Sequence, residues 1–256
     1  MPRVRPVSHE DRLTVVEHLD ELRHRIIVCL AALAVALGLC FWQSDVLLEI
    51  ATDPLPDGRD QLLTFGVTEP FTTTLTVSAY GALILSLPVL LYQLYAFVLP
   101  AFSRAERRAV LPILLLAPLL FVAGVAFAYF VVLPPATDFL LGFNDEQFQI
   151  EVRARDYYSF FSMTMLAGGL IFELPLALIA LTRLGIVSVD QLRANRRYAY
   201  LGMAVLAAAL PGVDPISMLI EMVPLLALYE LSILLARLFD RRSAAGGMAE
   251  PSTQER

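Results

Sequence analysis

Long runs of apolar residues separated by short charged segments are the dominant pattern along this chain. A run of about 17–25 apolar residues is long enough to cross a bilayer as a helix. We expect spans at about 26–42, 71–96, 109–134, 157–182, 198–211 and 216–236. The pattern therefore predicts an all-α polytopic membrane protein with six transmembrane helices.

The polar segments define the remaining organisation. Residues 1–13 are expected to be flexible, 14–238 to form the membrane domain, and 239–256 to be a disordered tail. The acidic segments 45–69 and 138–156 are expected to be loops on one side of the membrane, and the first of them to have little regular structure. Several prolines within the apolar runs predict bent helices, because proline removes a backbone hydrogen bond.

Two short sequence patterns predict helix starts. Thr14 and Glu17 have capping-box spacing, which opens an amphipathic helix that we expect to lie along the interface and run into the first span. Ser188 and Gln191 have the same spacing before the fifth run. That run is short for a straight span, so the bilayer thins there or the helix stops early.

The distribution of arginine predicts the orientation. All nineteen basic residues are arginine, and sixteen lie in the N-terminal segment, around 104–108, in 183–197 and in the tail. Positive residues concentrate on the cytoplasmic side, so both termini are predicted to be cytoplasmic. The mean hydropathy of +0.66 excludes a soluble domain, and the net charge of −6 argues against a nucleic-acid partner.

Two carboxylates close to the expected cytoplasmic surface are candidate binding groups. Glu106 lies among three arginines, and with Ser103 it also fits a capping box, so its spacing supports a helix cap and a ligand site equally. Glu21 precedes the first span, and Arg25 four residues later offers it a simple i,i+4 ion pair.

Three further glutamates lie inside expected spans. An ionisable group within the bilayer costs at least ~2.5–3.5 kcal/mol, and it is a functional candidate by default. Glu173 is the candidate in the fourth span; its structural alternative is a protonated side chain bonded to a hydroxyl such as Ser86 or Thr164. Glu221 and Glu230 in the last span lie nearer its ends, where water is accessible.

Catalytic and metal-binding motifs are missing from the sequence. It has no Gly-rich phosphate loop, zinc-protease motif or nucleophile elbow, and its three histidines all precede the apolar runs. We therefore expect no enzyme, no metal and no cofactor.

A set of motifs resembles TatC, the receptor subunit of the twin-arginine protein translocase. The matching motifs follow in order along residues 14–238: 17–25 (EHLDELRHR), 87–101 (from Leu-Pro to Leu-Pro-Ala), 106–108 (ERR), 127–134 (FAYFVVLP), 172–175 (FELP) and Asp214. The resemblance implies a cup-shaped, six-helix protein of the bacterial inner membrane. Its implied partners are twin-arginine signal peptides of folded cargo, the single-span subunits TatA and TatB, other TatC copies and membrane lipid.

The resemblance also implies roles for particular residues. Glu21 and Glu106 would receive the twin arginines, with Phe97 in the same patch and Arg23 supporting it. Glu173 would be the acid on the concave face, where it forms intramembrane partner contacts. Other functionally sensitive positions are implied at Pro54, Phe71, Pro88, Tyr129 and Asp214.

The chain departs from the family pattern where spans five and six contact TatA or TatB. Leu210 and Met218 replace polar residues, and Glu221 replaces an uncharged one, so Glu221 and Glu230 are candidates for that contact instead. The competing hypothesis from another class is a proton-coupled small-molecule transporter with Glu173 as its coupling site. It predicts solute uptake by this chain alone in proteoliposomes.

Overall fold

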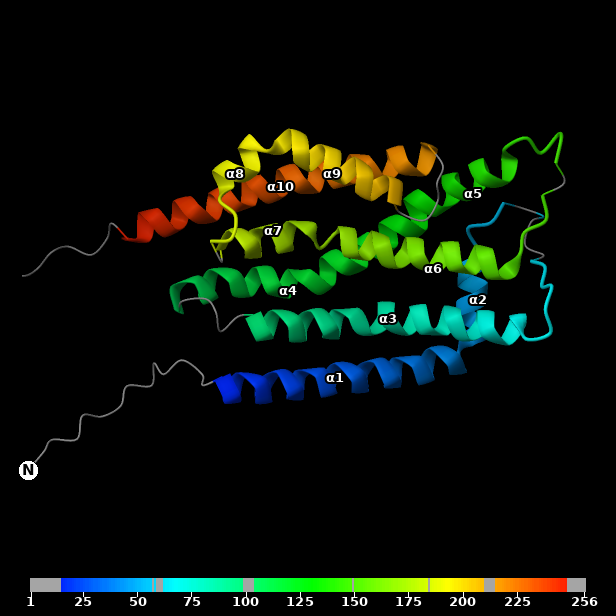
Figure 1. The fold of residues 1–256 in the computed structure, drawn as a ribbon, viewed down its shortest axis with the longest axis horizontal. Helices are drawn as coiled ribbons and strands as arrows, with labels where there is room; N and C mark the ends of the chain where they lie inside the picture. The colour runs from blue at the N-terminus through cyan, green and yellow to red at the C-terminus, as the bar shows by residue number, and fades with distance from the viewer. Residues whose placement is uncertain are drawn as a thin grey trace, which may run out of the picture.

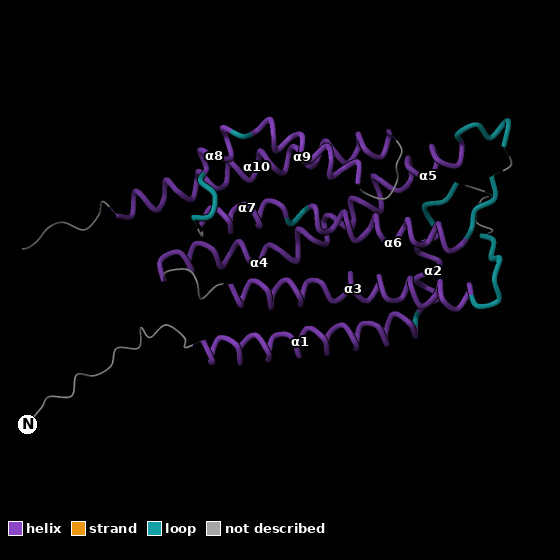
Figure 2. The backbone as a smooth tube through the Cα atoms, in the orientation of Figure 1, coloured by secondary structure: helices purple, strands orange, loops and turns teal. Residues whose placement is uncertain are grey.

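The computed structural model describes the backbone of residues 15–56, 58, 62–98, 104–148, 150–183, 185–209 and 215–247, and side chains over most of these ranges. Within them the chain is helical, apart from short turns and one isolated bridge between Leu63 and Arg153 (Figure 2). The elements are α1 Val15–Trp42, α2 Ser44–Thr52, α3 Glu69–Val98, α4 Arg104–Phe127, the π-helical η2 Ala128–Val132, α5 Leu133–Gly142, α6 Ala154–Ile171, α7 Leu174–Arg183, α8 Val189–Ala194, α9 Arg196–Ala209 and α10 Pro215–Gly247.

The long helices run along a common direction (Figure 1). α1 packs on α3, α3 packs on both α4 and α6, and α10 packs on α7 and α9. We call one end of the bundle the termini end: α1 and α4 begin there, and α3 and α10 end there (Figure 1). α3 and α6 begin at the opposite end, which we call the outer end. The all-α class predicted from the sequence is confirmed.

Five helical stretches in the described part of the chain are long and apolar enough to span a membrane: His18–Trp42, Glu69–Val98, Leu116–Gly142, Ala154–Thr182 and Pro215–Arg237. The expected fifth span corresponds to α9, which has 14 residues. At about 1.5 Å per residue, α9 is shorter than the hydrocarbon core of a bilayer. The count of six therefore stays a prediction.

Prolines interrupt two of the spans, as the sequence predicts. Pro134 cannot donate a hydrogen bond to Phe130, and the chain widens into the π-helical turn η2 at this point. Pro175 likewise cannot donate to Ile171, where α6 ends and a short turn leads into α7. Figure 2 shows that turn within an otherwise helical span.

Three glycines allow α4 and α6 to approach closely. A Cβ on Gly124 would overlap the carbonyl oxygen of Gly168 and lie 2.9 Å from the Cα of Gly169. A Cβ on Gly168 would lie 2.6 Å from the Cβ of Ala128. Only residues without a side chain permit backbones to pack this tightly, and membrane helices use small residues at such contacts.

Two expectations for the loops are wrong. Residues 138–142 and 154–156, expected to belong to the second loop, lie in α5 and α6, because these helices extend past the apolar runs. Residues 45–52, expected to lack regular structure, lie in α2, because Leu47 and Ala51 recur one turn apart and pack into the core of the outer end. At the other end, Ser188 and Gln191 form the expected capping box of α8. From Val15 the predicted N-terminal helix runs directly into the first span, since α1 is unbroken to Trp42; Thr14, the predicted cap, lies outside the described residues.

Candidate functional site

Glu21 lies at the termini end of the bundle and is held by Arg25. The Nη2 and Nε of Arg25 lie 2.5 and 3.1 Å from Oε1 of Glu21. Arg25 also donates to the side-chain oxygen of Gln93 at 2.9 Å and to the carbonyl of Ala96 at 3.2 Å, both on α3. The ion pair that the sequence offered as an alternative role for Glu21 is therefore present, and it also connects α1 to the end of α3.

Phe97 lies in the same patch. Its ring stacks on the imidazole of His18, one turn before Glu21, with 4.4 Å between ring centroids and 16° between planes. Arg23 is on α1 two positions after Glu21 and is exposed. The backbone of Glu106 is in the first turn of α4, which begins at the same end, whereas its side chain lies outside the described residues. We call Glu21, Arg23, Phe97 and the start of α4 the termini patch.

Glu173 is enclosed between helices, with 6% of its surface exposed. The hydroxyl of Tyr95, on the last turns of α3, donates to Oε2 of Glu173 at 3.1 Å. Oε1 is buried and has no hydrogen bond among the described residues. A hydroxyl partner was expected, but neither candidate supplies it: Ser86 donates to the carbonyl of Leu83, and the hydroxyl of Thr164 is itself unpaired within the described part.

The acidic residues of α10 have different surroundings. Glu230 accepts from Arg196 at 2.5 Å and from the hydroxyl of Tyr200 at 2.6 Å, so it connects α10 to α9. Glu221 is buried, and Met218 packs beside the core of α9 and α10. Leu210 and Asp214 lie outside the described residues.

Two of the remaining predicted residues meet at the outer end. The carbonyl of Pro54 accepts from the hydroxyl of Thr137 at 2.8 Å, and the hydroxyl of Tyr129 lies 2.9 Å from Oδ2 of Asp53. These contacts join the end of α2 to η2 and α5. Phe71 is exposed near the start of α3 and makes an edge contact with Phe41. Pro88 lies inside α3, away from both groups.

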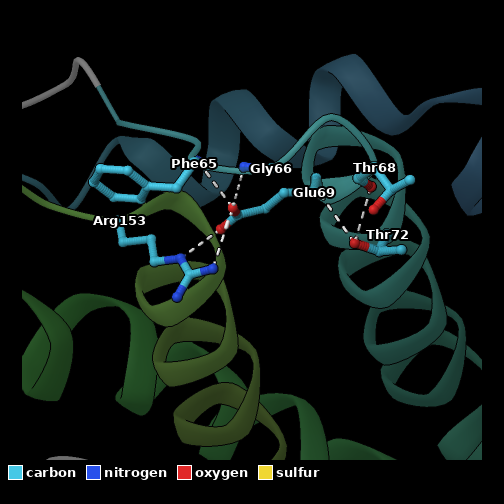
Figure 3. Close-up of polar contacts among 6 residues, drawn as sticks. All are labelled: Phe65, Gly66, Thr68, Glu69, Thr72 and Arg153. Carbon is cyan, nitrogen blue, oxygen red and sulfur yellow. Dashed lines mark hydrogen bonds and ion pairs between the residues drawn. The ribbon is translucent and has the colours of Figure 1, made fainter.

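The sequence pattern does not indicate the ion pair between Glu69 and Arg153 at the outer end, because both residues lie in segments predicted to be loops. Glu69 is 6% exposed and accepts from Arg153 at 2.6 Å and from the backbone N–H groups of Phe65 and Gly66 at 2.9 and 3.1 Å (Figure 3). The hydrogen bond to Glu69 raises the pKa of the Arg153 guanidinium above its ordinary value. A glutamate followed by Pro70 at a helix start was the available signal, since acids favour N-termini.

The fold and these polar positions define a polytopic helical membrane protein with long apolar spans and functional candidates at both of its ends. The family model of the Sec-independent protein translocase protein (TatC) matches residues 17–224. The chain belongs to the TatC family.

Known relatives extend over most of the chain. It is 37% identical to the Sec-independent protein translocase protein TatC of Desulforapulum autotrophicum, over 91% of this chain and 87% of the relative. It is 36% identical to TatC of Escherichia coli K12, over 91% and 92%. A crystal structure of the twin-arginine translocase receptor TatC superposes with a TM-score of 0.74 at 35% identity, covering 87% of this chain and 99% of that one.

Proposed function

We propose that this chain is the receptor component of a twin-arginine translocase and that it binds Arg-Arg signal peptides at the termini patch. The single observation that carries the proposal is that Glu21 and Phe97, 76 positions apart in sequence, are brought to one end of the bundle, where α4 also begins. The proposal places this end, with both termini, on the cytoplasmic side of the bacterial inner membrane.

The ion pair of Glu21 with Arg25 is compatible with docking. A fully exposed i,i+4 pair contributes only ~0.3–0.5 kcal/mol, but this one is part-buried, with 19% and 26% of the Arg25 and Glu21 side chains exposed. Arg25 keeps its bonds to Gln93 and Ala96 on α3 if Glu21 turns to an incoming guanidinium, which limits the penalty. Both contacts from Arg25 go to Oε1 of Glu21. An incoming arginine would approach Oε2 and pack against the Phe97 ring, since guanidinium groups stack on aromatic faces.

Two carboxylates at fixed separation would select arginine over lysine. The planar guanidinium forms bidentate bonds with a carboxylate, which a lysine ammonium cannot reproduce. Each charge-assisted hydrogen bond contributes about 1.5–3 kcal/mol. Loss of Glu21 or Glu106 is therefore expected to weaken signal-peptide binding about tenfold to a hundredfold.

The test is equilibrium binding of a fluorescent Arg-Arg signal peptide to the full chain in nanodiscs. Glu21→Ala and Glu106→Ala should each raise the Kd, and Asp20→Ala, an exposed acid one position away on α1, should leave it unchanged. A Lys-Lys peptide should bind the wild type as weakly as the Arg-Arg peptide binds the variants. Equal Kd values for Glu21→Ala, Glu106→Ala and Asp20→Ala would refute the docking role.

Glu173 is proposed to act after docking, in assembly with single-span TatA and TatB subunits and other TatC copies. Its buried carboxyl has one oxygen without a hydrogen bond among the described residues, so a partner's polar group would gain a bond there. Glu221, Glu230 and Met218 are proposed to serve the same contact surface. Glu173→Ala should impair cargo export while signal-peptide Kd stays unchanged; normal export by this variant would remove Glu173 from the mechanism.

The transporter hypothesis with Glu173 as its proton site receives no support from the comparisons, because the family match and the structural match are both to translocase proteins. Glu173 is nevertheless retained as a functional residue within the translocase.

A further inference from the structure

A polar cavity of about 380 Å³ lies between α3 and α6. Its lining residues are on or just before the first turns of these helices, which begin at the outer end of the bundle, away from the termini patch (Figure 1). All of its lining residues carry polar groups: Thr68, Thr72, Thr73, Thr76 and Tyr80 from α3 and the residue before it, and Arg155, Tyr158 and Ser159 from α6. The volume is within the range of small-ligand sites, about 300–1,000 Å³. A hydroxyl-lined cavity between two membrane helices is costly unless something fills it.

The cavity offers hydrogen-bond donors that have no acceptor. Thr72 and Thr76 donate to helix carbonyls, so their hydrogens are already used. The hydroxyl of Thr73 is buried and has no partner among the described residues. Tyr80 and Ser159 likewise make no hydrogen bond within that part of the chain. These unpaired donors call for a ligand rich in acceptor oxygens.

The charge at the cavity is positive. Arg155 lines it and has no ion pair among the described residues, and no lining residue is acidic. The acids close in sequence to the lining residues do not offset this charge. Glu69 is bonded to Arg153, and Asp156 is exposed and outside the lining. α6 begins beside the cavity, and the positive end of its dipole adds to the attraction for an anion.

The position of the cavity indicates what kind of anion reaches it. From Thr68 to Tyr80 the lining follows about three turns of α3, roughly 18 Å along a helix that is long and apolar enough to span a membrane. Phe71 and Leu75 are exposed on the same turns of α3, where acyl chains would lie against them. A soluble anion has no apolar portion to occupy that surface.

We propose that this cavity binds the phosphodiester headgroup of an anionic phospholipid from the leaflet at the outer end. Arg155 contacts the phosphate oxygens, Thr73 and Ser159 donate to the headgroup, and the acyl chains pack along Phe71 and Leu75. The bound lipid fills a polar gap between α3 and α6 and so joins the two helices at that end.

The experiment is native mass spectrometry of the full chain purified in detergent and titrated with phosphatidylglycerol, phosphatidylcholine or inorganic phosphate. The wild type should bind its first phosphatidylglycerol more tightly than phosphatidylcholine. Arg155→Gln should weaken phosphatidylglycerol binding about tenfold, since it removes a charge-assisted contact. Arg197→Gln, which removes an exposed arginine from α9 that stacks on Tyr198, should leave binding unchanged.

A second variant separates ligand binding from folding. Thr73→Val keeps the side-chain shape and removes the hydroxyl, so it should weaken phosphatidylglycerol binding about threefold while the lipid-free melting temperature stays equal or rises. If Arg155→Gln does not fold, Arg155→Lys replaces it and should also bind more weakly, because lysine lacks the guanidinium fork.

Three results would overturn the proposal. Equal phosphatidylglycerol affinity in wild type and both Arg155 and Thr73 variants would show that the cavity holds no lipid. Displacement of the lipid by millimolar inorganic phosphate would show a free-anion site instead. Crosslinking of a translocating polypeptide, rather than lipid, to a photoreactive group at position 159 would assign the cavity to cargo. Signal-peptide Kd should be normal in every variant, so this test is independent of the docking proposal.

Discussion

Replacement of Gly124 by alanine tests the close contact between α4 and α6. The added Cβ would overlap the carbonyl oxygen of Gly168 and lie 2.9 Å from the Cα of Gly169 and from the Cβ of Phe172. The first two are backbone atoms, which no side-chain rotation can move away. The helices must therefore separate, and contacts on both sides of the crossing are lost.

The magnitude follows from two opposing effects. Overpacking in a close-packed interior typically costs about 1–3 kcal/mol, whereas alanine is favoured over glycine inside a helix by roughly 0.5–1 kcal/mol. The steric cost exceeds the helical gain, because the obstructing atoms belong to the backbone. Each kcal/mol corresponds to about 2–4 °C in Tm for a chain of this size.

The assay is thermal unfolding of the purified chain in one detergent, followed by circular dichroism. Gly202→Ala in α9 is the matched control, because a Cβ there meets nothing within 4 Å. We expect Gly124→Ala to melt below the wild type and Gly202→Ala to melt at or above it. A Gly124→Ala variant that melts as high as Gly202→Ala would refute the packing argument.

Two other substitutions test polar contacts between helices. Tyr95→Phe leaves the buried carboxyl of Glu173 without its hydroxyl partner, which should cost about 1–3 kcal/mol and lower the Tm. The control Tyr92→Phe, at an exposed position, should leave the Tm unchanged. Equal Tm values for the two variants would contradict a stabilising role for the bond from Tyr95 to Glu173. Arg153→Gln removes the ion pair that fixes Glu69, so amide hydrogen exchange at residues 62–66 should become faster than in the wild type. Unchanged exchange would show that the backbone hydrogen bonds alone hold this loop.

The helical architecture was predictable because its signal is local. Lipid solvates long apolar runs only when their backbone groups are bonded internally, so each run reports a helix directly. The proline positions likewise indicate where a helix is interrupted, as before Pro175, because the missing N–H removes a hydrogen bond within the same helix. α2 was missed because its acids, Asp45 and Glu49, resemble a loop composition while its apolar residues recur at helical spacing.

The polar contacts were predictable only where they are close in sequence. The pair of Glu21 with Arg25 follows from i,i+4 spacing, and the capping box at Ser188 from a local pattern. The partner of Glu173 is Tyr95, 78 positions away, and no periodicity specifies which helix end delivers a hydroxyl to a distant carboxyl. Such contacts depend on how the helices pack, which hydrophobic patterning does not encode.

The most direct test of the central claim is site-specific photocrosslinking from the termini patch to an Arg-Arg signal peptide. Phe97→benzoylphenylalanine places the reactive group within the termini patch and leaves both candidate carboxylates, Glu21 and Glu106, intact. Phe71→benzoylphenylalanine, an exposed aromatic at the outer end, is the control. We predict that position 97 crosslinks the Arg-Arg peptide in inverted membrane vesicles, and that a Lys-Lys substitution in the peptide abolishes the product. Equal crosslinking of the Arg-Arg and Lys-Lys peptides from position 97, or none there, would contradict the account.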